Sequence, residues 1–143
     1  MEAPRTVLVA MDRPEIHSFL CSALTPDGYF VRHARHWITA LNFAREIPPR
    51  IVVLDYEMKN LELDLFLNQI GRLKNKTEII VIGDTDEKFG AKIAPYGFQY
   101  FFPKPLNCEL LVRTIRGLTL KVPQRIRALG APFYEAANLS PAR

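Results

Sequence analysis

Four charged side chains of this sequence lie at or just beyond the end of a short apolar run. They are Asp12, Asp55, Asp84 and Lys104. If folding brings these ends together, the neighbouring carboxylates repel each other unless a cation lies between them. Mg²⁺ is a suitable cation, because it prefers oxygen ligands and keeps several of its waters. A carboxylate beside such an ion and a lysine can accept a phosphoryl group, since both cations neutralise charge on the phosphoryl oxygens.

The apolar runs themselves are typical of buried strands. They are short and rich in β-branched residues, and they occupy residues 6–10, 29–31, 51–55, 78–84 and 100–102. Continuous apolar runs, unlike alternating ones, favour strands that are buried on both faces of a sheet. The sequence therefore predicts five strands, and residues 51–55 show the clearest pattern.

Segments with apolar residues at helical spacing follow the predicted strands. They cover residues 16–24, 37–44, 61–73, 89–94 and 110–118. Pro14 suits the first turn of the first helix, and Asn107 can cap the last one. Strands that alternate with helices indicate an α/β fold, in which a parallel sheet has helices on both faces. Ligands bind such a sheet beyond the carboxyl ends of its strands, so the charged side chains are expected to share that edge.

The composition is that of one folded domain followed by a basic tail. The chain has 143 residues, of which 48% are apolar and 24% are charged, so it can form a core. We expect a domain at residues 1–118, and a proline-containing tail or the start of a linker at residues 119–143. The tail holds four basic residues and one acidic residue, and so accounts for most of the formal charge of +4. The charge therefore does not indicate nucleic-acid binding, and the tail is too short for a helix-turn-helix domain.

Several other classes of protein are excluded by simple patterns. No apolar run approaches the roughly 20 residues of a membrane span, and no secretory signal is present, so we expect a cytoplasmic protein without membrane contact. Cys21 and Cys108 lack the spacing of a zinc site or a disulfide framework. No glycine-rich nucleotide-binding motif follows a strand, which argues against a flavodoxin-like electron carrier or another nucleotide-binding enzyme.

Four segments at the strand ends together resemble the CheY-like receiver domain of bacterial two-component response regulators. The segments are residues 7–14, 51–58, 79–84 and 101–105, and the resemblance extends over about residues 5–118. It implies a flavodoxin-like (βα)5 three-layer sandwich with five parallel strands in the order 2-1-3-4-5. It also implies a signalling module rather than a metabolic enzyme.

The resemblance assigns roles to individual residues. Asp55 would accept the phosphoryl group, and Lys104 would contact that group. Asp12 and Asp55 would bind Mg²⁺ together with the backbone carbonyl of Glu57, and Pro105 would follow a cis peptide bond. The partner that it implies is a sensor histidine kinase or a phosphotransfer protein.

The sequence departs from the family pattern at two positions of this site. Met11 stands where the family has the first of two adjacent acidic residues, which removes one carboxylate from the metal site. Gly83 stands where the family has the serine or threonine that bonds the phosphoryl group and draws the switch loop inward. Thr85 would replace that hydroxyl only after a rearrangement of the loop. Asp84 stands in place of a small residue, and its carboxylate could restore acidity to the site or could equally repel a phosphoryl group. Phe101 keeps the aromatic switch position on the fifth strand.

Two functions follow from this mixture of kept and altered positions. One is a phosphorylation-controlled signalling module in which Asp55 is phosphorylated but switching is impaired or atypical. The other is a pseudo-receiver that acts without phosphorylation as a protein-interaction or dimerisation module. In the second case a homodimer would form through the face made by the fourth helix, the fifth strand and the fifth helix.

Simpler structural roles are open for several of these residues. Asp55 and Asp12 could each cap a loop or a helix, and Lys104 could be a solvated loop lysine. The three histidines show no spacing shared by metal ligands, which favours surface or packing roles. Arg113 and Arg116 of the last helix are most simply interpreted as a solvated face.

Overall fold

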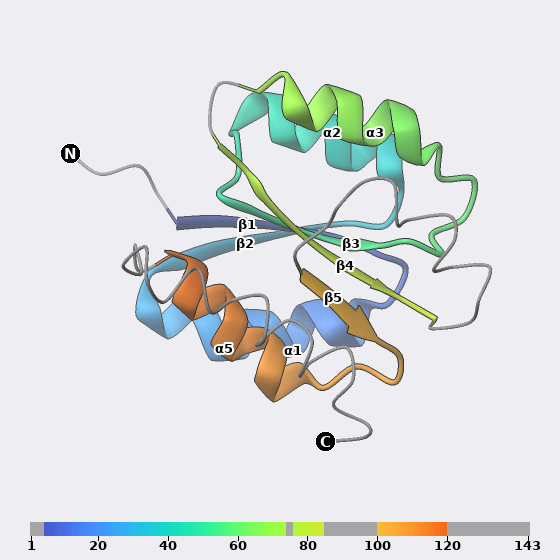
Figure 1. Cartoon of the computed structure of the whole chain (residues 1–143). Helices are drawn as coiled ribbons and strands as arrows, with labels where there is room; N and C mark the ends of the chain where they lie inside the picture. The colour runs from blue at the N-terminus through green and yellow to red at the C-terminus, as the bar shows by residue number, and fades with distance from the viewer. Residues whose placement is uncertain (1–4, 74–75, 85–99, 120–143) are drawn as a thin grey trace.

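The structure is a computed structural model, and it describes residues 5–73, 76–84 and 100–119. Five strands form one parallel sheet in the order β2-β1-β3-β4-β5 (Figure 1). They are β1 (Arg5–Ala10), β2 (Tyr29–Ala34), β3 (Ile51–Asp55), β4 (Glu78–Gly83) and β5 (Tyr100–Pro103). The flavodoxin-like order that the resemblance implies is confirmed.

Helices cover both faces of the sheet, which is the middle of three layers (Figure 1). The helices on one face are α2 (Trp37–Glu46) and α3 (Leu63–Gly71), and those on the other are α1 (Pro14–Leu24) and α5 (Cys108–Thr119). Alternate residues of β1 enter different cores, with Leu8 on the α2–α3 side and Val7 and Val9 on the α1–α5 side. Coverage on both faces explains why the strands are continuously apolar. Among the described residues, no helix has both the length and the apolar character to cross a membrane.

Local sequence signals determine where several elements begin and end. Pro14 occupies the first turn of α1, where a backbone N–H would have no helical acceptor. Gly28 has φ +89° and ends the short 3-10 helix η1 (Thr25–Asp27), a conformation that favours glycine. Asn107 Oδ1 accepts a hydrogen bond of 3.0 Å from the N–H of Leu110, so Asn107 caps α5 as predicted.

The sequence pattern predicts too short a length for β2 and too long a length for β4. β2 continues beyond the predicted residues 29–31, because residues 32–34 extend the ladder with β1. Polar residues on an edge strand interrupt the apolar pattern but leave the backbone pairing intact. β4 ends at Gly83, one residue before its predicted end. The helix predicted at residues 89–94 lies outside the described residues.

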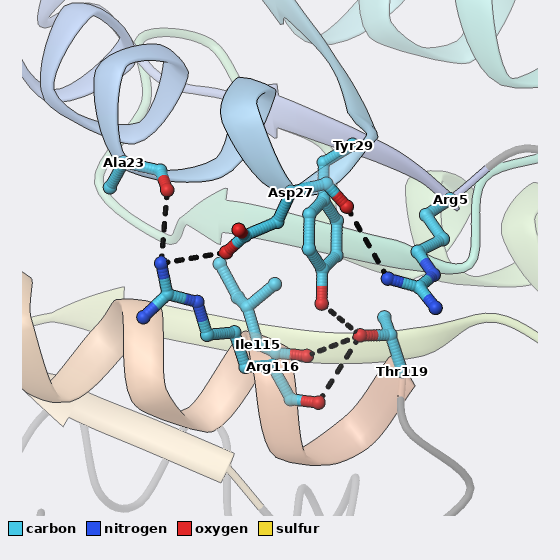
Figure 2. Close-up of polar contacts among 7 residues, drawn as sticks. All are labelled: Arg5, Ala23, Asp27, Tyr29, Ile115, Arg116 and Thr119. Atoms are coloured by element: carbon cyan, nitrogen blue, oxygen red, sulfur yellow. Dashed lines mark hydrogen bonds and ion pairs between the residues drawn. The ribbon is translucent and has the colours of Figure 1, made fainter.

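The amino end of β2 is joined to the carboxyl end of α5 by buried hydroxyl groups (Figure 2). The hydroxyls of Tyr29 and Thr119 are hydrogen-bonded to each other across a sequence separation of 90 residues. Thr119 Oγ1 also donates to the carbonyl oxygen of Ile115 (3.1 Å), so the Tyr29 hydroxyl serves as the donor to Thr119. The contact fixes the last turn of α5 against the first residue of β2.

An arginine of α5 adds a second connection at the same edge (Figure 2). The guanidinium of Arg116 lies 2.9 Å from Oδ2 of Asp27 and donates to the carbonyl oxygen of Ala23 (3.0 Å). Arg5 donates to the carbonyl oxygen of Asp27 (3.4 Å). Arg116 therefore lies on an exposed face, as predicted, and its side chain also contacts α1 and η1.

Candidate functional site

The carboxyl ends of four strands surround a cavity of about 340 Å³. Its charged lining residues are Arg13 after β1, Asp55 at the end of β3, Asp84 after β4 and Lys104 after β5. Its other lining residues are Met11, Ile16, Ile82, Pro105 and Leu106. The parallel sheet thus brings together three of the four charged residues that the sequence placed at strand ends, and it adds an arginine.

The carboxylate of Asp55 is held from two sides. Its Oδ1 accepts a hydrogen bond from the backbone N–H of Glu57 (2.8 Å). Its Oδ2 lies 3.2 Å from Nζ of Lys104, and 10% of the side chain is exposed, so water competes weakly with both contacts. Asp55 therefore closes a local turn, as the simpler interpretation expects, and it also presents a carboxylate to the cavity.

Lys104 lies between two carboxylates. Its Nζ is 2.7 Å from Oε1 of Glu57 and 3.2 Å from Oδ2 of Asp55. Burial lowers the pKa of Lys104, but the hydrogen bonds to Glu57 and Asp55 and the charges of these carboxylates outweigh it, so the pKa is raised above its ordinary value. The ammonium is therefore charged throughout the neutral range, and Lys104 is not merely a solvated loop lysine.

The backbone around Lys104 is joined to the neighbouring strand. Its N–H donates to the carbonyl oxygen of Gly83 (3.1 Å), which connects the end of β5 to the end of β4. The peptide bond between Lys104 and Pro105 is cis. Gly83 itself is buried and has no hydroxyl to offer the cavity.

Phe101 and Thr85 are the other two predicted switch positions, and the structure describes only the first of them. Phe101 is 3% exposed and packs in the core on the α2–α3 side of the sheet. Phe102 packs on the α1–α5 side, as the alternation of side chains along a strand predicts. Thr85 lies outside the described residues.

Asp12 is exposed and does not line the cavity. It does not cap α1 either, because the N-cap residue is Arg13 and no side chain accepts a capping hydrogen bond there. The interpretation of Asp12 as a helix cap is therefore wrong. The residue lies between two lining residues, Met11 and Arg13, in the loop that leaves β1.

The oxygen donors present fit Mg²⁺ at a minimal level. In the described ranges, no three acidic, histidine or cysteine side chains gather in a way that could hold a metal ion. Asp55 and Asp84 supply carboxylates to the cavity, and the thioether of Met11 is a poor ligand for this hard cation. Mg²⁺ keeps several waters and needs only one or two carboxylates, so Asp55 alone meets its smallest requirement. Asp12 is exposed in the loop after β1 and would have to turn toward the cavity to take part.

Two participants of this site were not indicated by the sequence. The carboxylate of Glu57, of which only the backbone carbonyl was expected to matter, pairs with Lys104. Arg13 lines the cavity and has no hydrogen-bond or ion-pair partner among the described residues. An arginine before a helix is most simply a surface residue. Its one distinguishing signal is its position after β1, the strand that pairs with β3.

A stacked pair of histidines lies behind Met11. His33 Nε2 donates to the carbonyl oxygen of Met11 (2.8 Å), and the rings of His17 and His33 have centroids 4.9 Å apart with 18° between their planes. Burial lowers the pKa of His17 and the charge of His33 lowers it further, whereas a backbone hydrogen bond to Val31 raises it less. These contacts are packing roles, as expected, although the spacing of the histidines does not reveal that they touch.

The topology is that of a doubly wound α/β domain, and the ionic cluster forms its candidate site at the carboxyl edge of the sheet. The sequence profile of the response regulator receiver domain family matches residues 7–116. The chain therefore belongs to this family of signal-transduction domains. Receiver domains are signalling modules, generally not metabolic enzymes, and they generally bind Mg²⁺ at the phosphorylation site.

Solved receiver domains share this fold. The receiver domain of the Francisella response regulator 1452 is 21% identical, with a TM-score of 0.67, and the match covers 82% of this chain and 98% of that one. The chemotaxis response regulator CheY4 of Vibrio cholerae is 22% identical, with a TM-score of 0.64 and coverage of 82% and 99%. A response regulator protein from Burkholderia multivorans is 23% identical, with a TM-score of 0.65 and coverage of 84% and 97%. At these identities the likeness establishes the fold alone.

Proposed function

We propose that this receiver domain accepts a phosphoryl group on Asp55 from a sensor histidine kinase or a phosphotransfer protein. The observation that carries the proposal is the side chain of Asp55, which is 10% exposed, contacts Lys104 at 3.2 Å and lines the cavity. A carboxylate that served only to close a turn would need neither the cavity nor the lysine.

In the proposed reaction, an oxygen of the Asp55 carboxylate attacks phosphorus while the bond from phosphorus to the leaving group breaks. The electron pair of that bond goes to the leaving group, and Asp55 becomes an acyl phosphate. The Glu57 N–H fixes the orientation of the carboxylate. Lys104 neutralises negative charge that develops on the phosphoryl oxygens, because its ammonium already faces the carboxylate.

The metal site that we propose consists of Asp55, the backbone carbonyl of Glu57 and Asp12, whose side chain would turn from its exposed position toward the cavity when the ion binds. A bound Mg²⁺ would supply further positive charge beside the transferred group. Its affinity is expected to be lower than that of a site with a full acidic pair, because Met11 leaves fewer charged oxygens to offset dehydration of the ion.

We further propose that switching is atypical, and Gly83 is the reason. Gly83 offers no hydroxyl to a phosphoryl group, and its carbonyl oxygen already accepts a hydrogen bond from the N–H of Lys104. Phosphorylation would therefore change the charge of the cavity without the hydroxyl that couples this charge to movement of the loop after β4.

The second candidate is a pseudo-receiver that binds a protein partner or a second copy of the chain without phosphorylation. The buried thioether of Met11 and the missing side chain of Gly83 favour this candidate. Part of the dimer face that it invokes, the fourth helix, lies outside the described residues. In this case Asp55→Ala would leave partner affinity and oligomeric state unchanged, as measured by light scattering and by titration with a partner.

Intact-mass spectrometry after incubation with acetyl phosphate and Mg²⁺ tests the first candidate. We expect one phosphoryl adduct on the wild-type chain, none on Asp55→Ala, and one on the control Asp64→Ala, which removes an exposed carboxylate of α3. An adduct that persists in Asp55→Ala would contradict the proposal. If the wild type shows no adduct, binding of beryllofluoride distinguishes a rapidly hydrolysed acyl phosphate from a site that cannot form one.

A further inference from the structure

Arg13 and Lys104 follow strands that lie on opposite sides of β3, the strand that ends in Asp55. In the sheet order β2-β1-β3-β4-β5, the strands β3 and β4 lie between β1 and β5. Arg13 follows β1 and Lys104 follows β5, and both side chains line the same cavity as Asp55. A group attached to Asp55 would therefore have one cation on each flank.

Lys104 and Arg13 differ in whether they already have carboxylate partners. Lys104 is shared between the carboxylates of Asp55 (3.2 Å) and Glu57 (2.7 Å). Arg13 has no such partner in the part of the chain that the structure describes, although it lines a cavity with Asp55. A guanidinium presents several N–H donors in a planar fork that matches two oxygens of a phosphoryl group.

Phosphorylation of Asp55 would add negative charge at the point where these cations converge. Lys104 already forms ion pairs with two carboxylates before the reaction begins. The metal site lacks the carboxylate that Met11 replaces, so it also offers less compensation than a full acidic pair. Arg13 is the described cation of the cavity that remains available to the added charge.

We propose that Arg13 binds oxygens of the phosphoryl group on Asp55, opposite Lys104. The inference rests on the proposed phosphorylation of Asp55, and it makes Arg13 a phosphoryl-binding residue that shares charge neutralisation with Lys104 and the metal site. Both cations then hold the group by charge-assisted hydrogen bonds, which are stronger than neutral ones.

Calorimetric titration of the full chain with beryllofluoride, at saturating Mg²⁺, tests this role without a chemical step. Arg13→Gln is expected to raise the dissociation constant about tenfold, the effect of losing one charge-assisted hydrogen bond that is partly open to water. Arg13→Lys keeps the charge but loses the planar fork of donors. Its affinity for beryllofluoride is therefore expected to lie between those of the wild type and Arg13→Gln. The matched control is Arg35→Gln, because Arg35 is exposed, follows β2 at the same edge and does not line the cavity.

The outcomes separate this inference from the function on which it rests. If Arg13→Gln binds beryllofluoride as tightly as the wild type, the role of Arg13 is overturned and phosphorylation of Asp55 is unaffected. Equal losses in Arg13→Gln and Arg35→Gln would also overturn it, because they would show a general effect of charge. If the wild type neither binds beryllofluoride nor forms an Asp55-dependent adduct, the proposed function fails and the role of Arg13 fails with it.

Discussion

Polar side chains lie at both the amino edge and the carboxyl edge of the parallel sheet, but the two edges differ in whether these side chains have partners. At the amino edge, Arg116 is paired with Asp27, and the hydroxyls of Tyr29 and Thr119 bond to each other (Figure 2). At the carboxyl edge, Arg13 lines a cavity without a partner among the described residues. The first edge is a closed network, whereas the second has a position open to a ligand.

We interpret this difference as one between a structural role at the amino edge and the proposed binding role at the carboxyl edge. Buried polar groups that satisfy one another hold segments of the chain together. A cation that faces a cavity contributes little until an anion arrives. Substitutions at the amino edge are therefore expected to change the free energy of unfolding and leave phosphorylation intact, and substitutions at the carboxyl edge are expected to do the reverse.

The largest effect is expected from Lys104→Met at the carboxyl edge. Phosphorylation of Asp55 by acetyl phosphate should slow roughly a hundredfold, the typical cost of removing one fixed group that stabilises developing charge. The rate of adduct formation, followed by intact mass, measures this. Lys59→Met, which removes an exposed lysine, is the control. A rate for Lys104→Met close to that of the wild type would remove the distinction between the edges.

Thr119→Val should have the largest effect on stability. It leaves the Tyr29 hydroxyl buried without its partner, so the free energy of unfolding should fall by about 1–3 kcal/mol. Denaturant unfolding measures the loss, and adduct formation on Asp55 should be unchanged. The double variant with Tyr29→Phe should be less destabilised than the sum of the two single variants, since neither hydroxyl is then stranded. Strict additivity would count against a direct contact.

Stability should depend on pH through His17. Its pKa is lowered by burial and then by the charge of His33, so the folded protein binds fewer protons than the unfolded chain. The free energy of unfolding should therefore decrease as the pH falls from about 6.5, and the loss is complete below the lowered pKa. Thermal unfolding over a pH series should show a weaker dependence for His17→Gln than for the control His36→Gln, which changes an exposed histidine. Identical profiles would show that His17 does not carry the effect.

Arg116→Ala should have the smallest effect. The side chains of Arg116 and Asp27 are 44% and 47% exposed, so their ion pair should contribute less than about 1 kcal/mol and weaken with added salt. Denaturant unfolding at low and high salt measures this, with Arg113→Ala as an exposed control on the same helix. A loss as large as that of Thr119→Val would mean that the hydrogen bond to the Ala23 carbonyl matters more than the ion pair.

The fold was predictable because its central strands are continuously apolar. β3 matches its predicted bounds, since each of its residues is buried between two layers of helices. The length of β2 was underestimated because β2 is an edge strand. There Arg32 and His33 pair with β1 through the backbone, while their side chains interrupt the apolar pattern. Sequence patterns report burial directly and backbone pairing only indirectly.

The placement of residues around the cavity was predictable where it depends on the end of a strand. Asp55 and Lys104 follow from the rule that parallel strands present their carboxyl ends at one edge. The inward position of Arg13, the outward position of Asp12 and the pairing of the Glu57 carboxylate depend on how loops turn after those ends. That geometry is set by packing in three dimensions, so residue type and spacing did not indicate it.

The loop that carries Lys104 contains its own spectroscopic reporter. Proline has no backbone N–H, so the Lys104 amide is the one exchangeable backbone hydrogen of residues 103–105. That amide donates to the carbonyl oxygen of Gly83 (3.1 Å). Hydrogen–deuterium exchange at this single position therefore measures how often the end of β5 separates from β4, and it does so in the free protein, before any phosphodonor or metal is added.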